Sequence, residues 1–235
     1  MKLVDSYVSI PQIDGIQMMK AIEKACRTCY RSEGSITDDS YKTLLKNCIT
    51  RGHESVLEHE KVTVQIMCDI GAYKDLTRHR IASFSIESTR YCCYDKDKFD
   101  GEISYIVPVF YDDGYVSKDG SIEYQNTDQQ KTFEWRECMS AIEKSYMKMR
   151  EMGATPDECR MLLPHSTAAL VTMTANIREW KHIFQLRCNS HVHPSIQKFM
   201  IPLLLHFKKL MPEIYDDVQY NEDFPKEKYA EIKIG

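Results

Sequence analysis

No stretch of this 235-residue sequence is apolar and long enough to cross a membrane. The longest apolar run covers residues 199–205 and is interrupted by Pro202, whereas a spanning helix needs roughly 20 apolar residues. Residues 1–6 have neither the apolar centre of a secretory signal nor its small-residue cleavage site. We therefore expect a cytoplasmic protein that has no membrane attachment.

The sequence also lacks an excess of basic residues. Its 31 Lys and Arg stand against 35 Asp and Glu, which gives a formal net charge of -4. Domains that bind nucleic acid usually carry a basic stripe or patch, so we expect no nucleic-acid partner. An anionic ligand would instead need a local group of arginines, and residues 78–90 contain three arginines but only one acidic residue.

Three motifs of common enzyme classes are absent: G-x-G-x-x-G, G-x-x-x-x-G-K-[ST] and G-x-S-x-G. Their absence removes the main support for a dinucleotide-binding Rossmann fold, a P-loop enzyme or an α/β-hydrolase. There is also no internal repeat and no low-complexity stretch. The length fits one compact domain or at most two small ones, and we expect a single domain over residues 1–235.

Cysteine is plentiful, but its pattern does not indicate disulfides or a metal. The nine cysteines are odd in number and scattered through apolar segments, which fits a reducing compartment. Cys26 and Cys29 form a C-x-x-C within a helical pattern without a second pair, which favours packing over redox or zinc chemistry. Neither His191 with His193 nor residues 53–59 have the H-E-x-x-H spacing. We therefore expect no metal site.

The spacing of apolar residues predicts mostly helices. Alternation predicts a strand over residues 62–68, and residues 103–110 form a second strand that Pro108 places at an edge. Residues 111–126 are rich in Asp, Gly, Ser and Asn and predict a flexible loop. The helical patterns cover residues 14–30, 37–52, 72–80, 127–153 and 176–188, together with a last helix after Pro194 that Pro202 kinks or breaks.

A short helix begins after Thr155, where Pro156 occupies the first helical position and Glu158 completes a capping box. Arg160 therefore lies early in a well-started helix. The order of helices, then strands, then mostly helices predicts an α+β fold with an antiparallel sheet flanked by helices.

The first candidate binding cluster is Arg78-His79-Arg80, with Ser88 and Arg90 shortly after it. On a straight helix, Arg78 and Arg80 point about 200° apart, so they cannot hold one small anion together. They can serve two ligands, or two parts of a large one, and guanidinium groups suit phosphate oxygens. The alternative is a solvated surface turn.

The second cluster lies in the helix over residues 176–188. Arg178 and His182 share a face because they are four positions apart, whereas Arg187 faces the opposite side. Arg187 either reaches a different ligand or interacts with the C-terminal end of the helix dipole. The apolar side of the helix over residues 176–188 consists of Ile177, Trp180, Ile183 and Phe184.

Outside this helix, His53 follows the helix-ending Gly52 and so lies in a loop able to approach a ligand.

Five segments together resemble the flavin-dependent thymidylate synthases. Arg78-His79-Arg80, followed after seven residues by Ser88, matches the R-H-R-x7-S signature of that family. The resemblance covers roughly residues 14–210, with the segments in the same order and spacing. The others are residues 52–59 (G-H-x-S-x-x-E-H), 88–91 (S-x-R-Y), 160–164 (R-x-x-L-P) and 174–191 (T-x-N-x-R, then L-R and a histidine).

The resemblance implies an enzyme that converts dUMP to dTMP without a cysteine nucleophile. It implies 5,10-methylenetetrahydrofolate as carbon donor, FAD as redox carrier and NADPH as reductant. It also implies a mixed helix and sheet fold and a homotetramer in which each FAD site is shared between subunits. The alternative is a nucleotide-binding regulatory protein of the same fold that lacks redox activity, because residues 85–87 depart from the family's N-E-x-S pattern. Residues 193–197 are a second departure, since they replace the A-Q-W-E-I-R segment that is frequent in the family.

The resemblance also implies roles for individual residues. Arg187 faces the uracil, where a guanidinium stabilises charge on a carbonyl oxygen as C5 becomes nucleophilic. His53 lies by the flavin and the folate, and Ser88 joins Arg187 and His53 as the catalytic set. The implied dUMP residues are Ser88, Arg90, Arg160, Arg187, Glu87 and Asp75, and the implied FAD residues are Ser55, Glu58, Arg78, His79, Arg80, Ser85, Asn176, Arg178, His182 and His191.

Overall fold

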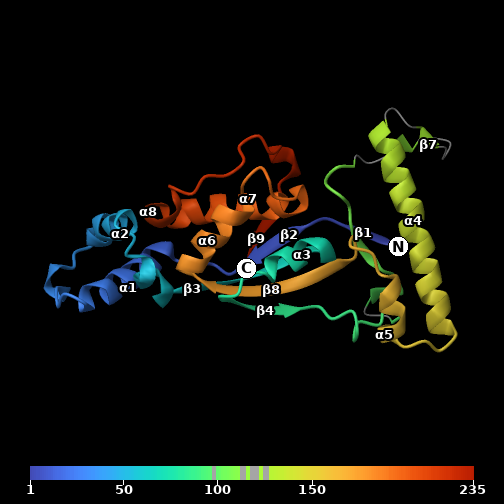
Figure 1. Cartoon of the computed structure of the whole chain (residues 1–235), viewed down its shortest axis with the longest axis horizontal. Helices are drawn as coiled ribbons and strands as arrows, with labels where there is room; N and C mark the ends of the chain where they lie inside the picture. Colours follow the sequence, from blue (N-terminus) through green and yellow to red (C-terminus); the bar gives the residue numbers. More distant parts are fainter. Residues whose placement is uncertain (97–98, 112–114, 117–121, 124–126) are drawn as a thin grey trace. The chain divides into compact units, whose positions relative to one another are not determined.

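The computed structural model describes residues 1–96, 99–111, 115–116, 122–123 and 127–235 (Figure 1). The chain divides into two compact units and passes repeatedly from one to the other. The first unit is Met1–Ser6, Met67–Asp75 and Ile86–Val171, and the second is Tyr7–Ile66, Leu76–Ser85 and Thr172–Gly235. No helix within the described residues is both long and apolar enough to span a bilayer.

A five-stranded sheet has the order β4-β8-β3-β2-β9. The hydroxyls of Thr63 and Thr174 are 2.7 Å apart, and Gln65 Nε2 donates to Thr172 Oγ1 at 3.4 Å. Residue numbers therefore rise on β3 as they fall on β8, so these two strands are antiparallel. The strands are β2 Tyr7–Ile10, β3 Lys61–Asp69, β4 Ala82–Ile86, β8 Ala168–Asn176 and β9 Glu231–Ile234.

Two other strand pairs are parallel. β9 runs parallel to β2, with Tyr7 opposite Glu231, and β1 (Lys2–Val4) runs parallel to β5 (Ser104–Ile106). The predicted α+β class is confirmed, but the antiparallel sheet is wrong for these pairs. The long chain segments that join them allow a parallel crossover, and side-chain alternation carries no information on strand direction.

Helices of the second unit enclose an aromatic core. α7 packs against β2, β9 and α6, while both α1 and α6 contact η2. The rings of Trp180 and Phe184 stack with centroids 5.5 Å apart, and Phe207 contacts both. The elements are α1 Gly15–Thr28, η1 Glu33–Ser35, α2 Ser40–Thr50, η2 Glu54–His59, α6 Ile177–Arg187, α7 Pro194–Leu210, α8 Pro212–Tyr215 and η5 Lys226–Lys228.

Helix α7 continues past Pro202 without a break. A proline has no N–H, so the carbonyl of Lys198, four residues earlier, loses its helical partner. The N–H of Ala230 donates to that carbonyl at 2.8 Å. The segment that leads into β9 therefore supplies the hydrogen bond that Pro202 cannot make.

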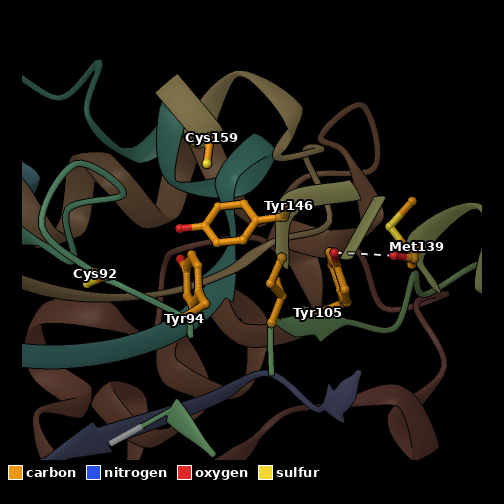
Figure 2. Packing of buried hydrophobic residues seen from close by; sticks show 7 residues of the cluster. Cys92, Tyr94, Tyr105, Met139, Tyr146 and Cys159 are labelled. Atoms are coloured by element: carbon orange, nitrogen blue, oxygen red, sulfur yellow. Dashed lines mark hydrogen bonds between the residues drawn. The ribbon is translucent and has the colours of Figure 1, made fainter. Parts of the chain in front are cut away.

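The first unit has its own core, built on the long helix α4 (Thr127–Glu151). Tyr94 and Tyr146 meet edge to face with ring centroids 5.6 Å apart, and the Tyr105 hydroxyl donates to the carbonyl of Met139 at 3.4 Å (Figure 2). Met139 and Tyr146 are buried, so this side of α4 packs on the core of the unit. This unit also holds β1, β5, β6 (Tyr115–Val116), β7 (Ile122–Glu123), α5 (Pro156–Cys159) and η4 (Arg160–Leu162).

Several predicted boundaries change. Helix α3 (Ile70–Leu76) ends before Arg78, and the N–H of His79 donates to the carbonyl of Leu76 at 3.0 Å. The R-H-R segment is therefore a turn and not part of a helix. The strand predicted over 103–110 is the shorter β5, and β1, β2, β4, β6, β7, β8 and β9 were not predicted. Of the loop predicted over 111–126, residues 112–114, 117–121 and 124–126 lie outside the described residues.

Candidate functional site

The end of helix α2 places His53 in an exposed loop, as predicted. Gly52 has φ +71, a conformation that glycine adopts without strain. Its N–H donates to the carbonyl of Ile49 at 2.9 Å, and the N–H of His53 donates to that of Cys48 at 2.8 Å. These two bonds form a Schellman motif, which ends α2 and turns the chain into η2.

A pocket of about 670 Å³ lies in the second unit and is lined by η2, the turn after α3, and α6. Its size is in the range typical of cofactor sites. Most of the predicted FAD residues line it, and so does Arg187, which was predicted to face uracil. The predicted residues it brings together are Glu58, Arg78, His79, Arg80, Asn176, Arg178, His182 and Arg187.

Helix α6 directs its polar side chains to this pocket because its apolar side is buried. The side chain of Asn176 caps the helix by accepting the N–H of Glu179 at 2.7 Å. The predicted packing side is confirmed. Arg187 was expected to face away from Arg178, but both line the pocket, because it extends to the last residue of the helix. The fully buried side chains are Ile177, Trp180, Ile183 and Phe184.

The glutamates of η2 that line the pocket form ion pairs with Arg178 and Lys181 of α6. Arg178 Nη1 donates to Glu58 Oε1 at 2.6 Å, and its Nε is 3.9 Å from Glu54 Oε2. Lys181 is 2% exposed, and its Nζ contacts Asp217 Oδ2 at 2.8 Å and Glu54 Oε1 at 3.7 Å. A buried ammonium needs such partners, since desolvation of an unpaired charge is costly. Glu54 is thereby fixed between Arg178 and Lys181.

His79 lies buried between two side chains of α6. Arg187 Nε donates to His79 Nε2 at 3.0 Å, and His79 Nδ1 is 3.4 Å from Glu179 Oε1. Burial, together with the nearby Arg187 and His182, lowers the pKa of His79 to about 4. Burial also raises the pKa of the Glu179 carboxyl. At pH 7 the ring is therefore neutral; it accepts a hydrogen bond from Arg187 and lies next to Glu179.

The residues that line the pocket suit a cofactor with a diphosphate and flat rings. Because Arg78 and Arg80 belong to a turn, both line the same pocket, contrary to the divergence expected for a helix. Ile81 and Leu186 are 67% and 45% exposed and add apolar surface to the lining. Cationic side chains outnumber acidic ones, with Arg78, Arg80, Arg178, Lys181 and Arg187 against Glu54, Glu58 and Glu179.

Sequence reasoning assigned no role to Glu54, Glu179 or Lys181 in this pocket. The sequence of α6 contains a signal that Glu179 and Lys181 have partners, because they flank the fully buried Trp180. Charged residues at the border of an apolar stripe are buried only when they have partners. Their partners come from distant segments, and a helical pattern does not identify them.

Three predicted FAD residues do not line this pocket. Ser55, with His53, lines a second pocket of about 460 Å³ formed by α1, α2 and η2. Ser85 is an exposed residue of β4. His191 is exposed in the turn after α6, where its N–H donates to Asn189 Oδ1 at 3.0 Å. Their roles stay predictions.

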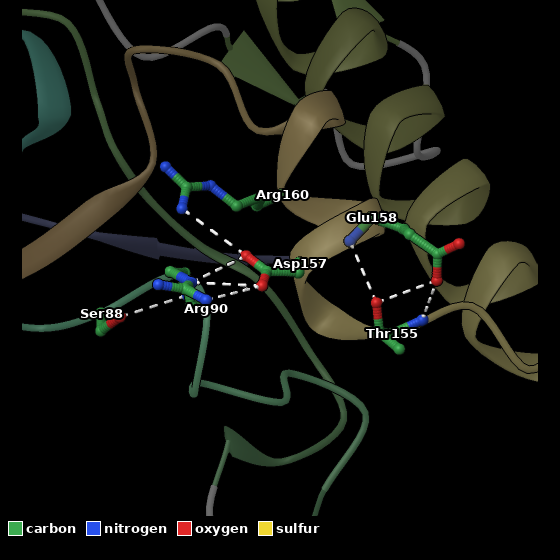
Figure 3. A network of polar contacts seen from close by, with 6 residues as sticks. All are labelled: Ser88, Arg90, Thr155, Asp157, Glu158 and Arg160. Carbon is green, nitrogen blue, oxygen red and sulfur yellow. Dashed lines mark hydrogen bonds and ion pairs between the residues drawn. The ribbon is translucent and has the colours of Figure 1, made fainter.

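A second polar cluster lies in the first unit and contains three of the predicted dUMP residues (Figure 3). Asp157 accepts from Arg90 Nε at 3.0 Å and from Arg90 Nη2 at 3.1 Å, and its Oδ1 is 3.7 Å from Arg160 Nη1. The Ser88 hydroxyl accepts the N–H of Arg90 at 3.3 Å. Arg90 is the main cause that lowers the pKa of Asp157. One carboxylate thus binds two guanidinium groups, an arrangement that also suits a phosphate.

The start of α5 positions Asp157 and Arg160. Glu158 N–H donates to Thr155 Oγ1 at 3.3 Å, and Thr155 N–H donates to Glu158 Oε2 at 2.6 Å (Figure 3). The predicted capping box is therefore confirmed. It fixes the single turn of α5, from which Asp157 extends. Arg160 was expected early in this helix, but α5 ends at Cys159, so Arg160 is its C-cap and the first residue of η4.

The other two predicted dUMP residues of the first unit are half-buried. Glu87 binds the backbone of β8: its N–H donates to the carbonyl of Leu170 at 3.0 Å, and its Oε2 accepts the N–H of Leu170 at 3.3 Å. Asp75 lies in the last turn of α3. Arg187, in contrast, belongs to the second unit.

All nine cysteines are free. Burial raises the pKa of Cys26 to about 11 and that of Cys68 and Cys188 further, so these thiols are poor nucleophiles. Within the part of the chain that the structure describes, no three His, Cys, Asp or Glu side chains gather as metal ligands would.

Comparison of the sequence with protein families gives one clear result. A family model described as thymidylate synthase complementing protein matches residues 14–213. The flavin-dependent thymidylate synthase of Geobacter sulfurreducens is 29% identical over 204 residues, which are 84% of this chain and 80% of that protein. The flavin-dependent thymidylate synthase of Thermosipho africanus is 30% identical over 200 residues, which are 83% and 84% of the two chains.

Comparison with solved structures gives the same fold. The crystal structure of a UMP/dUMP methylase, PolB from Streptomyces cacaoi bound with 5-Br dUMP, matches with a TM-score of 0.73 and 22% sequence identity. The match covers 92% of this chain and 96% of that one. The arrangement of helices and strands is therefore shared beyond the matched sequence segments.

Proposed function

Because the chain belongs to the family of the thymidylate synthase complementing proteins, we propose that it is a flavin-dependent thymidylate synthase, which converts dUMP to dTMP. The observation that carries this proposal is the pocket that brings Arg78, Arg80 and Arg178 together with Arg187. The relatives that match along most of the chain bear the name of that enzyme. They do not favour a regulatory protein without redox activity.

The arginine-rich pocket of the second unit fits FAD. Arg78 and Arg80 would hold the diphosphate, and Asn176, Arg178 and His182 would hold the rest of the cofactor along α6. When bound, FAD carries electrons from NADPH to the nucleotide, and 5,10-methylenetetrahydrofolate supplies the carbon.

The chain's own residues bind and polarise the nucleotide. Ser88, Arg90 and Arg160 would bind the phosphate and sugar of dUMP, since they present two guanidinium groups and a hydroxyl. Arg187 would face the uracil, where its guanidinium stabilises charge that develops on a carbonyl oxygen. Its hydrogen bond to His79 fixes its direction before the substrate arrives. The raised pKa of the buried thiols agrees with a reaction that needs no cysteine nucleophile.

We further propose that the protein is a homotetramer that shares its FAD sites between subunits and that it works in the cytoplasm. The support for the tetramer is the resemblance of the motifs to those of the family. Light scattering of the FAD-loaded protein tests it directly, with a mass four times 27.5 kDa expected. A monomer with full activity would contradict the shared site.

Absorption spectroscopy of the purified protein, mixed with FAD and then desalted, tests the function. We expect retained flavin that bleaches with NADPH under anaerobic conditions and whose spectrum changes with dUMP. Addition of 5,10-methylenetetrahydrofolate should then give dTMP, measured by chromatography. Binding of dUMP without retained flavin and without dTMP would favour the regulatory alternative.

Asp157 competes with the dUMP phosphate in this proposal, because its carboxylate binds Arg90 and approaches Arg160. We expect Asp157→Asn to lower the KM for dUMP about threefold, in line with the small contribution of exposed ion pairs, without a change in kcat. Steady-state kinetics at low ionic strength measure this, since salt screens the contact. Asp223→Asn, at an exposed position outside both clusters, is the matched control. A higher KM would mean that Asp157 orders the arginines and does not compete with the phosphate.

A further inference from the structure

The imidazole of His79 lies between two residues of α6. His79 and Glu179 are buried, with only 5% and 7% of their surface exposed. Glu179 lies in the first turn of the helix and Arg187 is its last residue. His79 comes from the turn after α3 and offers one ring nitrogen to each: Nδ1 to Glu179 at 3.4 Å and Nε2 to Arg187 at 3.0 Å.

Glu179, His79 and Arg187 form a row in this order, and the donors and acceptors of the row define one tautomer of the imidazole ring. The neutral ring carries a single proton, on either Nδ1 or Nε2. The Nε–H of Arg187 points at His79 Nε2, so this nitrogen must be the acceptor and the proton must be on Nδ1. The Glu179 carboxylate, whose Oε1 lies 3.4 Å from Nδ1, is then placed to accept Nδ1–H. In the other tautomer, two N–H groups would oppose each other at Arg187.

We propose that Glu179 is a positioning residue for Arg187: its carboxylate keeps the proton of His79 on Nδ1, and His79 Nε2 in turn orients the guanidinium. The inference rests on the proposed action of Arg187 on uracil. It gives His79 a task in addition to the FAD contact that the resemblance implies. Histidines that bind a metal are oriented by carboxylates in the same way, and here the oriented group is a guanidinium.

The protonation states of His79 and Glu179 limit the pH range in which the row can orient Arg187. The charged and titratable groups that face His79 are Glu179, Arg187 and His182, whose ring centroid is 6.1 Å away. A proton on His79 Nε2 removes the acceptor for Arg187, and a proton on Glu179 removes the acceptor for Nδ1–H. Both events occur on the acid side, because both groups act in their deprotonated forms. Turnover should therefore fall at low pH in the wild type.

A double-mutant cycle separates this role from a structural one. Glu179→Leu keeps the side-chain size but removes the acceptor, so we expect kcat to fall about 10- to 100-fold, as for other residues that orient a functional group. Glu179→Gln keeps an acceptor oxygen and should retain most of the activity. In a His79→Gln background the amide oxygen can accept from Arg187 without help, so adding Glu179→Leu should change kcat less than about threefold. Equal losses in both backgrounds would overturn the proposal.

Nitrogen-15 NMR of the histidine rings gives a readout that does not need activity. In the protein without FAD at pH 7, the ring signals that disappear in His79→Gln should show a neutral ring with its proton on Nδ1. Glu179→Leu should move them toward the Nε2–H form, while Glu222→Gln, at an exposed glutamate, should leave them unchanged. An Nε2–H ring in the wild type would overturn the proposal. An Nδ1–H ring that depends on Glu179, in a protein that forms no dTMP, would support the positioning role and contradict only the proposed function.

Discussion

Replacing Arg187 by alanine should lower kcat for dTMP formation by about 10²- to 10³-fold, the usual loss when a group that stabilises developing charge is removed. The side chain is half-buried and held by His79, so its guanidinium is ordered before the reaction and costs little reorganisation. Charge appears on the uracil carbonyl only as C5 becomes nucleophilic. The interaction is therefore stronger in the transition state than in the ground state, and kcat should fall more than dUMP binding does.

FAD retention should survive this substitution. Arg78, Arg80 and Arg178 still line the pocket, and the flavin absorbance after desalting measures how much cofactor remains. Lys46→Ala, which removes a cation from an exposed position of α2, serves as the control for the change in net charge. Loss of FAD, with normal turnover once FAD is saturating, would show that Arg187 binds the cofactor and does not act on uracil.

The local elements of the fold could be predicted from the sequence where one side chain pattern decides them. Helices α4 and α6 follow from apolar residues at helical spacing, and α5 follows from the capping box of Thr155 and Glu158. The parallel pairing of β2 with β9 could not be predicted, because these strands are joined by most of the chain. The continuous α7 depends likewise on Ala230, which replaces the hydrogen bond missing at Pro202.

For the candidate site, too, the sequence predicted which residues take part but not the contacts between them. The motifs identified Arg78, Asn176 and Arg178, which line one pocket. They did not reveal that His79 binds both Glu179 and Arg187, because these contacts join residues that are about a hundred positions apart in the sequence. The contact between Asp157 and Arg90 also bridges two distant segments. Motif spacing locates the residues of a site, whereas their partners and protonation states depend on the tertiary structure.

Replacing Trp180 by alanine should lower the free energy of unfolding by about 3–5 kcal/mol, the usual cost of removing a large aromatic side chain from a core. Trp180 is fully buried and contacts the rings of Phe184 and Phe207 with centroids 5.5 Å and 5.6 Å away. Its Nε1 donates to the carbonyl of Val62 at 3.0 Å, so the side chain also ties α6 to β3. The substitution leaves a cavity and removes this hydrogen bond in the same place.

Urea unfolding of the protein without FAD, followed by circular dichroism, measures this loss. Trp180→Phe keeps a ring in the core but lacks the donor for Val62, so its loss should be smaller than that of Trp180→Ala. Met152→Ala removes a large apolar side chain that is 78% exposed and should change stability by less than about 0.5 kcal/mol. If Trp180→Ala lost under about 1 kcal/mol, the aromatic core would not be what holds α6 on the sheet. The pocket residues of α6 would then owe their positions to its N-cap and to the ion pairs of Lys181 and Arg178.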